Sequence, residues 1–245
     1  MTDYLKNTVG ALLCLIFTLG VITALIVIST GLSVEARLDL FEEDRAVEWA
    51  TVVIYLAAFG IGLWYYLTRA RGDLLLISAT IFALIATLDE LSFGERIIGF
   101  EAPRVGQTKL DAVHDLASIA KRQLKATTDH HYLLGGFILL VLILIGLWVC
   151  RILVRRGWTL RFGPEALFLI LGAALLAYAQ AIDINLRILP LKELKALYVE
   201  EVFELGSGLC VMCFAGLRGL AMRDASLTPS PLPSATGGGR LSPKI

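Results

Sequence analysis

Long apolar runs, separated by short polar stretches, dominate the pattern of residues along the chain. Six of these runs predict membrane-spanning helices, because about 20 residues are needed to cross roughly 30 Å of hydrocarbon. The first run has no charged residue between Lys6 and Glu35. It is too long for the apolar core of a signal peptide, so we interpret it as a retained anchor. The sequence thus predicts an all-α, polytopic membrane protein. The expected spans cover residues 9–33, 47–68, 73–92, 131–153, 164–184 and 198–222.

Composition agrees with this interpretation. Hydrophobic residues make up 57% of the 245 residues, and the mean hydropathy is +0.74, whereas soluble domains average about 45–50% apolar residues. The net charge is zero, so no basic field points to nucleic acid. The expected partners are the lipid bilayer and a second membrane protein. Residues 1–223 are expected to form one helical bundle, and 224–245, rich in Pro, Ser and Gly, a disordered cytoplasmic tail.

The arginines of two short loops predict the orientation. Arg69 and Arg71 lie between spans two and three, and four more arginines lie at the end of span four and after it, namely Arg151, Arg155, Arg156 and Arg161. By the positive-inside rule both loops are cytoplasmic. Six spans then place both termini in the cytoplasm and residues 93–130 outside, in an inner (plasma) membrane. On this topology all three histidines lie outside. Four of the 22 acidic residues lie inside, namely Asp3, Asp73, Glu165 and Asp224.

Most of the acidic residues thus gather at the outer ends of the spans. Spans three, five and six reach a sufficient length only if the acids at their outer ends are included. A lone carboxylate at that depth costs at least about 2.5–3.5 kcal/mol, so these groups should face the bundle interior and find partners. Arg96 and Arg187 are candidate cations. Either ion pairs that fix helix register or a shared acidic pocket would explain the pattern. The acids concerned are Glu48, Asp89, Glu90, Asp183, Glu200, Glu201 and Glu204.

The outer loop is expected to contain an amphipathic helix over residues 108–126. Apolar residues recur there at spacings of three and four, and Asp111, His114 and Asp115 fall on a neighbouring face. Such a D-x-x-H-D pattern can supply ligands to a divalent metal or orient a histidine as a general base. A surface helix with solvated side chains is the alternative. We expect His114 to share one site with Glu90 and a glutamate of 200–204. The candidate metal ligands are His114, Glu90 and His130.

The segment DELSFGERIIG, residues 89–99, resembles a motif in a family of uncharacterised bacterial polytopic membrane proteins. The family pattern is E-E-x-S-W-G-Q-R-I-x-G followed by a short helix with L-H-N, and Val113-His114-Asp115 stands in the corresponding place. This chain departs from the pattern at Asp89, Phe93, Glu95 and Asp115. The resemblance implies no known activity. It implies that a small set of residues acts together, namely Glu90, Ser92, Gly94, Arg96 and His114.

Three classes of function are compatible with these features. The leading hypothesis is a non-enzymatic subunit, sensor or binding protein whose outer face recognises a partner. The second is a metal-dependent hydrolase at the membrane interface, in which activated water attacks a lipid or amide. The third is a transporter of a small cation or solute. The spans show no interrupting proline and no clear inverted repeat, features that many transporters have.

Overall fold

The structure, a computed structural model, consists almost entirely of helices in the part of the chain that it describes. The described residues are 2–41, 45–69, 71–92, 104–105, 108–109, 119, 131–160, 162–183 and 198–227. Their helices are α1 (Thr2–Gly31), α2 (Val34–Phe41), α3 (Ala46–Thr68), α4 (Leu74–Glu90), α7 (His131–Arg155), α8 (Ala166–Asp183) and α10 (Val199–Leu227). A helix thus lies at each of the six positions where an apolar run predicts one.

Three helical stretches are long and apolar enough to cross a membrane. They are Thr8–Gly31, Val34–Thr68 and Val199–Met222, and Ala166–Ile182 forms a shorter apolar helix. Large apolar side chains also cover the outside of the bundle. Trp64, for example, is 65% exposed and Leu13 62% exposed. A soluble protein rarely presents so much contiguous apolar surface, so an apolar surrounding accounts best for these faces.

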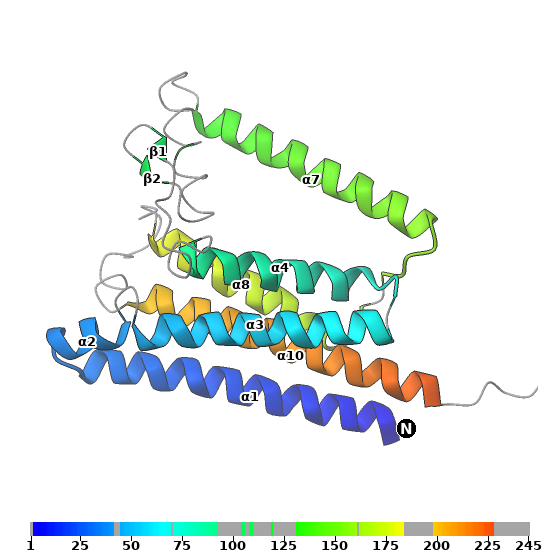
Figure 1. Ribbon diagram of the computed structural model, residues 1–245, viewed down its shortest axis with the longest axis horizontal. Coiled ribbons are helices and arrows are strands. Elements are labelled where there is room, and N and C mark those ends of the chain that lie inside the picture. Colours follow the sequence, from blue (N-terminus) through cyan, green and yellow to red (C-terminus); the bar gives the residue numbers. More distant parts are fainter. Residues whose placement is uncertain are drawn as a thin grey trace, which may run out of the picture.

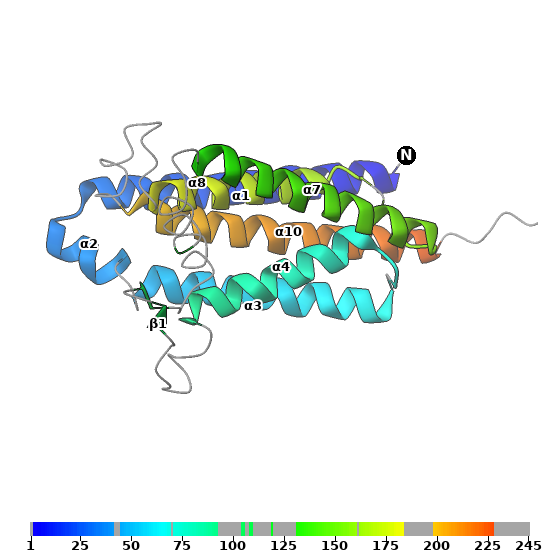
Figure 2. The ribbon, with the colours of Figure 1, turned by 90° about the horizontal axis from the view of Figure 1, so that it is seen from above.

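The long helices run side by side and alternate in direction (Figure 1). The chain enters α1 and leaves α10 at the same end, which we call the N-terminal end. The opposite end, with α2 and the close of α4, is the far end. Helix α10 is central, since it packs against α1, α3, α4 and α8. Figure 2, the view from above, shows α10 between α1 and α3. Helix α7 runs along one side, set apart from the others in Figure 1.

Small residues allow α10 to come close to its neighbours. A Cβ added at Gly206 would lie 2.6 Å from Cδ1 of Ile22 in α1, and one at Gly208 would lie 3.1 Å from Cγ2 of Ile54 in α3. Larger side chains at either position would push the helices apart. Close approach through glycine is typical of helices that pack in membranes, where apolar side chains gain nothing by leaving lipid.

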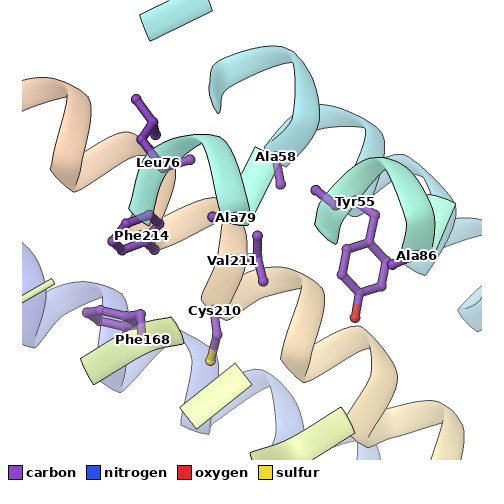
Figure 3. Close-up of a cluster of buried hydrophobic side chains, with 11 residues drawn as sticks. Tyr55, Ala58, Leu76, Ala79, Ala86, Phe168, Cys210, Val211 and Phe214 are labelled. Atoms are coloured by element: carbon purple, nitrogen blue, oxygen red, sulfur yellow. The ribbon is translucent and has the colours of Figure 1, made fainter. Parts of the chain in front are cut away.

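The main core forms where α3, α4, α8 and α10 meet (Figure 3). Tyr55, Leu76 and Phe214 are fully buried there, and Phe168 of α8 packs against them from the side. The Tyr55 ring contacts Phe82 edge to face, with ring centroids 6.1 Å apart, an arrangement that aromatic pairs favour. This core fixes the rotation of four helices and hence the direction of their polar side chains.

Two expected boundaries differ from the structure. Residues 108 and 109 form a strand rather than the start of a helix. Strand β2 (Thr108–Lys109) pairs antiparallel with β1 (Arg104–Val105), with Arg104 opposite Lys109. The apolar spacing that suggests a helix begins only at Leu110, so the helical signal does not cover these two residues. Helix α10 continues to Leu227 and so includes the first residues of the expected tail; residues 228–245 lie outside the described part.

Candidate functional site

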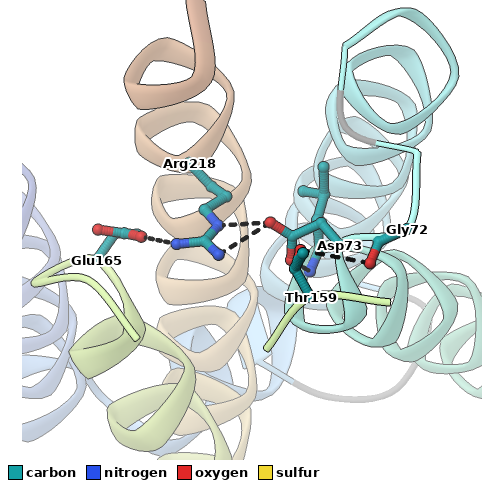
Figure 4. A network of polar contacts seen from close by, with 6 residues as sticks. Gly72, Asp73, Thr159, Glu165 and Arg218 are labelled. Atoms are coloured by element: carbon teal, nitrogen blue, oxygen red, sulfur yellow. Dashed lines mark hydrogen bonds and ion pairs between the residues drawn. The ribbon is translucent and has the colours of Figure 1, made fainter. Parts of the chain in front are cut away.

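Arg218 of α10 joins two carboxylates at the N-terminal end of the bundle (Figure 4). Its Nε and Nη2 each lie 2.9 Å from Oδ2 of Asp73, and its Nη1 donates to Oε1 of Glu165. All three residues are buried, with exposed fractions of 5%, 2% and 6% for Arg218, Asp73 and Glu165. We call these three residues the ion-pair cluster.

Local structure places Asp73 in this cluster. Asp73 is the N-cap of α4, and its Oδ1 accepts a hydrogen bond from the Leu76 amide at 3.1 Å. Its Oδ2 is therefore left to accept hydrogen bonds from Arg218. The backbone around it is tied to the α7–α8 connection, because Leu74 N–H donates to Thr159 O at 3.0 Å and Thr159 N–H donates to Gly72 O at 2.7 Å. Gly72 has φ +90°, a left-handed conformation that favours glycine.

Glu165 reaches the cluster from the turn that leads into α8. The turn is closed by Ala166 N–H, which donates to Gly163 O at 3.0 Å. A Cβ at Gly163 would collide with the Glu165 carboxylate, so the side chain can fold over this residue only because it is glycine. The carboxylate is thereby directed toward α10 rather than toward solvent.

The cluster links the inner core to two connections that are distant in sequence. A guanidinium carries five donors in a planar fork and can serve two carboxylates at once. Charges removed from water are costly alone, and the attraction between them offsets that cost only when the geometry is good. The cluster therefore connects α10 to the start of α4 and to the turn that leads into α8. One guanidinium and two carboxylates give it a net formal charge of one negative.

A second polar group lies toward the far end, on four helices. The Tyr55 hydroxyl of α3 donates to Glu204 O of α10 at 3.3 Å. Gln180 of α8 donates from Nε2 to Glu204 Oε1 at 3.0 Å. Glu90 of α4 lies within electrostatic range of the same Tyr55 hydroxyl, and the Ser207 side chain lies next to it. Figure 3 shows the Tyr55 hydroxyl on the α10 side of α3. Of the expectation that Glu90, Glu201 or Glu204 contacts another span with Arg96 or Arg187 nearby, the contact is seen for Glu204, while both arginines lie outside the described residues.

The other predicted acids lie near this group or beyond it. Glu48 is buried, with an exposed fraction of 7%, and Asp89, Glu90, Glu200 and Glu201 are half-buried. All of them take part in polar or electrostatic contacts. We call Glu48, Asp89, Glu90, Glu200, Glu201 and Glu204 the far-end acidic group. Ser92 follows α4 with φ 49°, and Asp183 is the last residue of α8.

The remaining predicted site residues lie outside the described part of the chain. They are Arg96, Asp111, His114, Asp115, His130 and Arg187. The site that would join His114 to Glu90 and a glutamate of α10 therefore stays a prediction. Among the described residues, no group of three or more His, Cys, Asp or Glu is placed to hold a metal ion.

The ion-pair cluster was not predicted from the sequence, although signals for it exist. Asp73 and Glu165 are two of the four acids assigned to the inner side, and Arg218 is the first charged residue after the uncharged core of span six. Charged residues inside an apolar helix usually face a partner. Comparisons of the chain with family models, with curated proteins and with solved structures found no match.

Proposed function

We propose that the chain is an inner-membrane protein that crosses the bilayer six times, with both termini in the cytoplasm. The alternating helices and the arginines Arg69, Arg71, Arg155 and Arg156 at the N-terminal end support this topology. Tryptophans lie near both ends of α3, at Trp49 and Trp64, which are about 22 Å apart at 1.5 Å per residue. That distance is shorter than the roughly 30 Å of hydrocarbon, so both rings can lie within the depth of one membrane.

We further propose that the protein is a binding or sensor subunit whose outer face takes a cationic ligand. One observation carries this proposal: Gln180 of α8 holds the Glu204 carboxylate of α10, and Glu90 of α4 lies within electrostatic range of the Tyr55 hydroxyl, which itself donates to the main-chain oxygen of Glu204. Carboxylates in partly buried surroundings attract a cation more strongly than carboxylates in water, because the effective dielectric constant is lower. The four other acids of the far-end acidic group add negative potential at the same end, namely Glu48, Asp89, Glu200 and Glu201.

Ligand-dependent thermal stability of the purified protein tests this proposal. The protein in mild detergent is first analysed for bound metal, and is then titrated with Ca²⁺, Zn²⁺ and a polyamine. A cation that binds the folded state raises the unfolding temperature as its concentration exceeds the dissociation constant. Glu204→Gln with Glu90→Gln should abolish the shift. Glu35→Gln, on an exposed residue of α2, is the matched control and should keep it.

Two results would overturn parts of this proposal. A protein that contains no metal and is stabilised by none of these cations does not have the proposed site. A C-terminal reporter that is active only outside the cytoplasm would overturn the topology. Stoichiometric metal that is lost in His114→Ala would instead support the hydrolase hypothesis, because that histidine would then be a metal ligand.

A cation carrier is a second candidate, favoured by the contrast between the two ends. The ion-pair cluster ties the N-terminal end together, while the acids gather at the opposite end. A carrier needs such a difference between its two sides at each stage of transport. Uptake of the stabilising cation into proteoliposomes distinguishes the two candidates, since a binding or sensor subunit gives no uptake above that of empty vesicles.

A further inference from the structure

A groove lies on the surface of the bundle where α3 and α10 meet. It is lined by Gly60, Ile61, Trp64 and Tyr65 of α3 and by Gly216 and Leu220 of α10, and its volume is about 390 Å³. The lining side chains are apolar except for the phenol hydroxyl of Tyr65 and the indole N–H of Trp64. The groove is therefore suited to an apolar ligand, and it is separate from both polar groups described above.

Two glycines leave the space that forms this groove. A Cβ added at Gly60 or at Gly216 would meet no atom within 4 Å, so the volume over both residues is open. Trp64 and Leu220, with exposed fractions of 65% and 45%, form its sides. Tyr65 is held in position because its ring packs directly against Gly219. The groove is thus part of the helix packing and does not depend on a loop.

Basic residues follow the groove toward the N-terminal end of the bundle. Gly60, Trp64 and Leu67 recur at spacings of four and three, which places them on one face of α3, and Arg71 lies in the turn that follows this helix. The Arg71 Nε donates to Leu67 O at 3.3 Å, so this side chain lies back against the end of α3. Arg69 is also exposed, about 8 Å along the chain axis from Trp64 at 1.5 Å per residue. Two exposed cations thus lie just beyond the end of α3 that carries the groove.

We infer that this groove binds one acyl chain of an anionic phospholipid, whose headgroup lies at Arg69 and Arg71. Basic residues at the membrane surface attract anionic headgroups, and the apolar groove excludes the headgroup and accepts the chain. A docked helix fits the groove less well. The groove covers one turn of each helix, about 6 Å, whereas a stable helix pair needs contacts over several turns.

The inference rests on the membrane insertion proposed above, and it does not depend on the cation site at the far end. Lipid vesicles with the same composition in both leaflets also make the test independent of orientation. A reversed topology would therefore overturn the proposed orientation and still leave the lipid site measurable.

Quenching of Trp64 fluorescence by brominated lipid tests the inference. The chain has four tryptophans, so Trp49, Trp148 and Trp158 are replaced by phenylalanine, which leaves Trp64 as the reporter. The protein is reconstituted in phosphatidylcholine vesicles with increasing fractions of brominated phosphatidylglycerol or brominated phosphatidylcholine. We expect phosphatidylglycerol to bind at Trp64 at least about fivefold more strongly than phosphatidylcholine. This is the gain expected when one or more basic residues near the membrane surface attract an anionic headgroup.

Two variant sets show where the preference arises. Gly60→Leu with Gly216→Leu fills the groove, and Arg69→Gln with Arg71→Gln removes the cations while the helices stay intact. Each set should reduce the preference to below twofold. Gly20→Leu is the matched control, because Gly20 is an exposed glycine of α1 with open space around it, and it should keep the full preference.

Three results would overturn the inference. The first is equal quenching by both lipids in the parent protein. The second is an unchanged preference after the groove is filled, which would indicate general attraction of anionic lipid to the basic end. The third is a Trp64 that neither lipid quenches, in a protein that is dimeric until the groove is filled, which would identify the groove as a contact between two copies.

Discussion

Arg218→Met removes the one cation that the described part of the chain places between two buried carboxylates. Methionine is close to arginine in length and is apolar, so the change deletes the charge while it leaves most of the volume filled. Asp73 and Glu165, only 2% and 6% exposed, would then remain buried without their shared partner. Removal of one partner from a buried ion pair costs about 3–5 kcal/mol, and two carboxylates place this variant at the upper end.

The buried thiol of Cys210 offers a direct assay for this loss. Cys210 is fully buried, and Cys150 is exposed. Cys14 and Cys213 are only half-buried, so a background with Cys14→Ala, Cys150→Ser and Cys213→Ala leaves Cys210 as the reporter. In this background, a thiol-reactive dye should report the temperature at which the bundle opens. A loss of this size should lower the midpoint by about 10 °C or more for a chain of this length. Arg155→Met, on an exposed arginine at the same end, is the control and should change stability by less than about 0.5 kcal/mol.

A triple variant separates charge from shape. When Asp73→Asn and Glu165→Gln accompany Arg218→Met, no charge is left in the ion-pair cluster, and we expect much of the lost stability to return. Replacement of a whole buried ion pair is often neutral, whereas removal of one member is not. An Arg218→Met protein with an unchanged midpoint would refute the role of the guanidinium. A triple variant no more stable than the single one would show that shape, rather than charge, dominates.

Three further changes are predicted from the packing. Gly219→Ala should cost about 1–3 kcal/mol, because its Cβ collides with the Tyr65 ring; Gly146→Ala, with open space around it, should not destabilise. Tyr55→Phe should cost about 0.5–1.5 kcal/mol, the worth of its hydroxyl hydrogen bond. Asp73→Ala should be about 1 kcal/mol less stable than Asp73→Asn, because the amide oxygen can still cap α4. Dye reactivity of Cys210 on heating measures all of these, and a reversed order within any pair contradicts the packing described.

The positions of the helices could be predicted because long apolar runs leave few alternatives. The expected and observed bounds agree to within a few residues for α3, α4 and α8. Helix α2 was not predicted, since residues 34–41 are too short and too charged to resemble a span. A local signal was present, however. Ser33 accepts a hydrogen bond from the Ala36 amide at 3.3 Å, and Phe41 is fully buried at the end of the helix.

The polar contacts could be predicted only in part. The depth of Glu204 in the bundle followed from the length of the uncharged core of span six. Its observed partner, Gln180, is a neutral amide, whereas charge patterning along the sequence points only to cations as partners for buried acids. The pairing of Arg218 with Asp73 and Glu165 needs the rotation of three helices about their axes. That rotation depends on side-chain packing around α10, which hydrophobic spacing alone does not determine.

The central position of α10 bears on the choice between a binding subunit and a carrier. This helix carries Glu204 and Arg218, which are about 21 Å apart at 1.5 Å per residue. Both contact neighbouring helices, so a movement of α10 would disturb contacts at both ends.

A carrier that used such a movement would have to break the ion-pair cluster in each cycle, against a cost of about 3–5 kcal/mol for a separated buried pair. The glycines at 206 and 208 further restrict sliding against α1 and α3. A fixed α10 with an acidic far end suits a binding or sensor subunit better, because recognition at the far end then requires no opening of the N-terminal end.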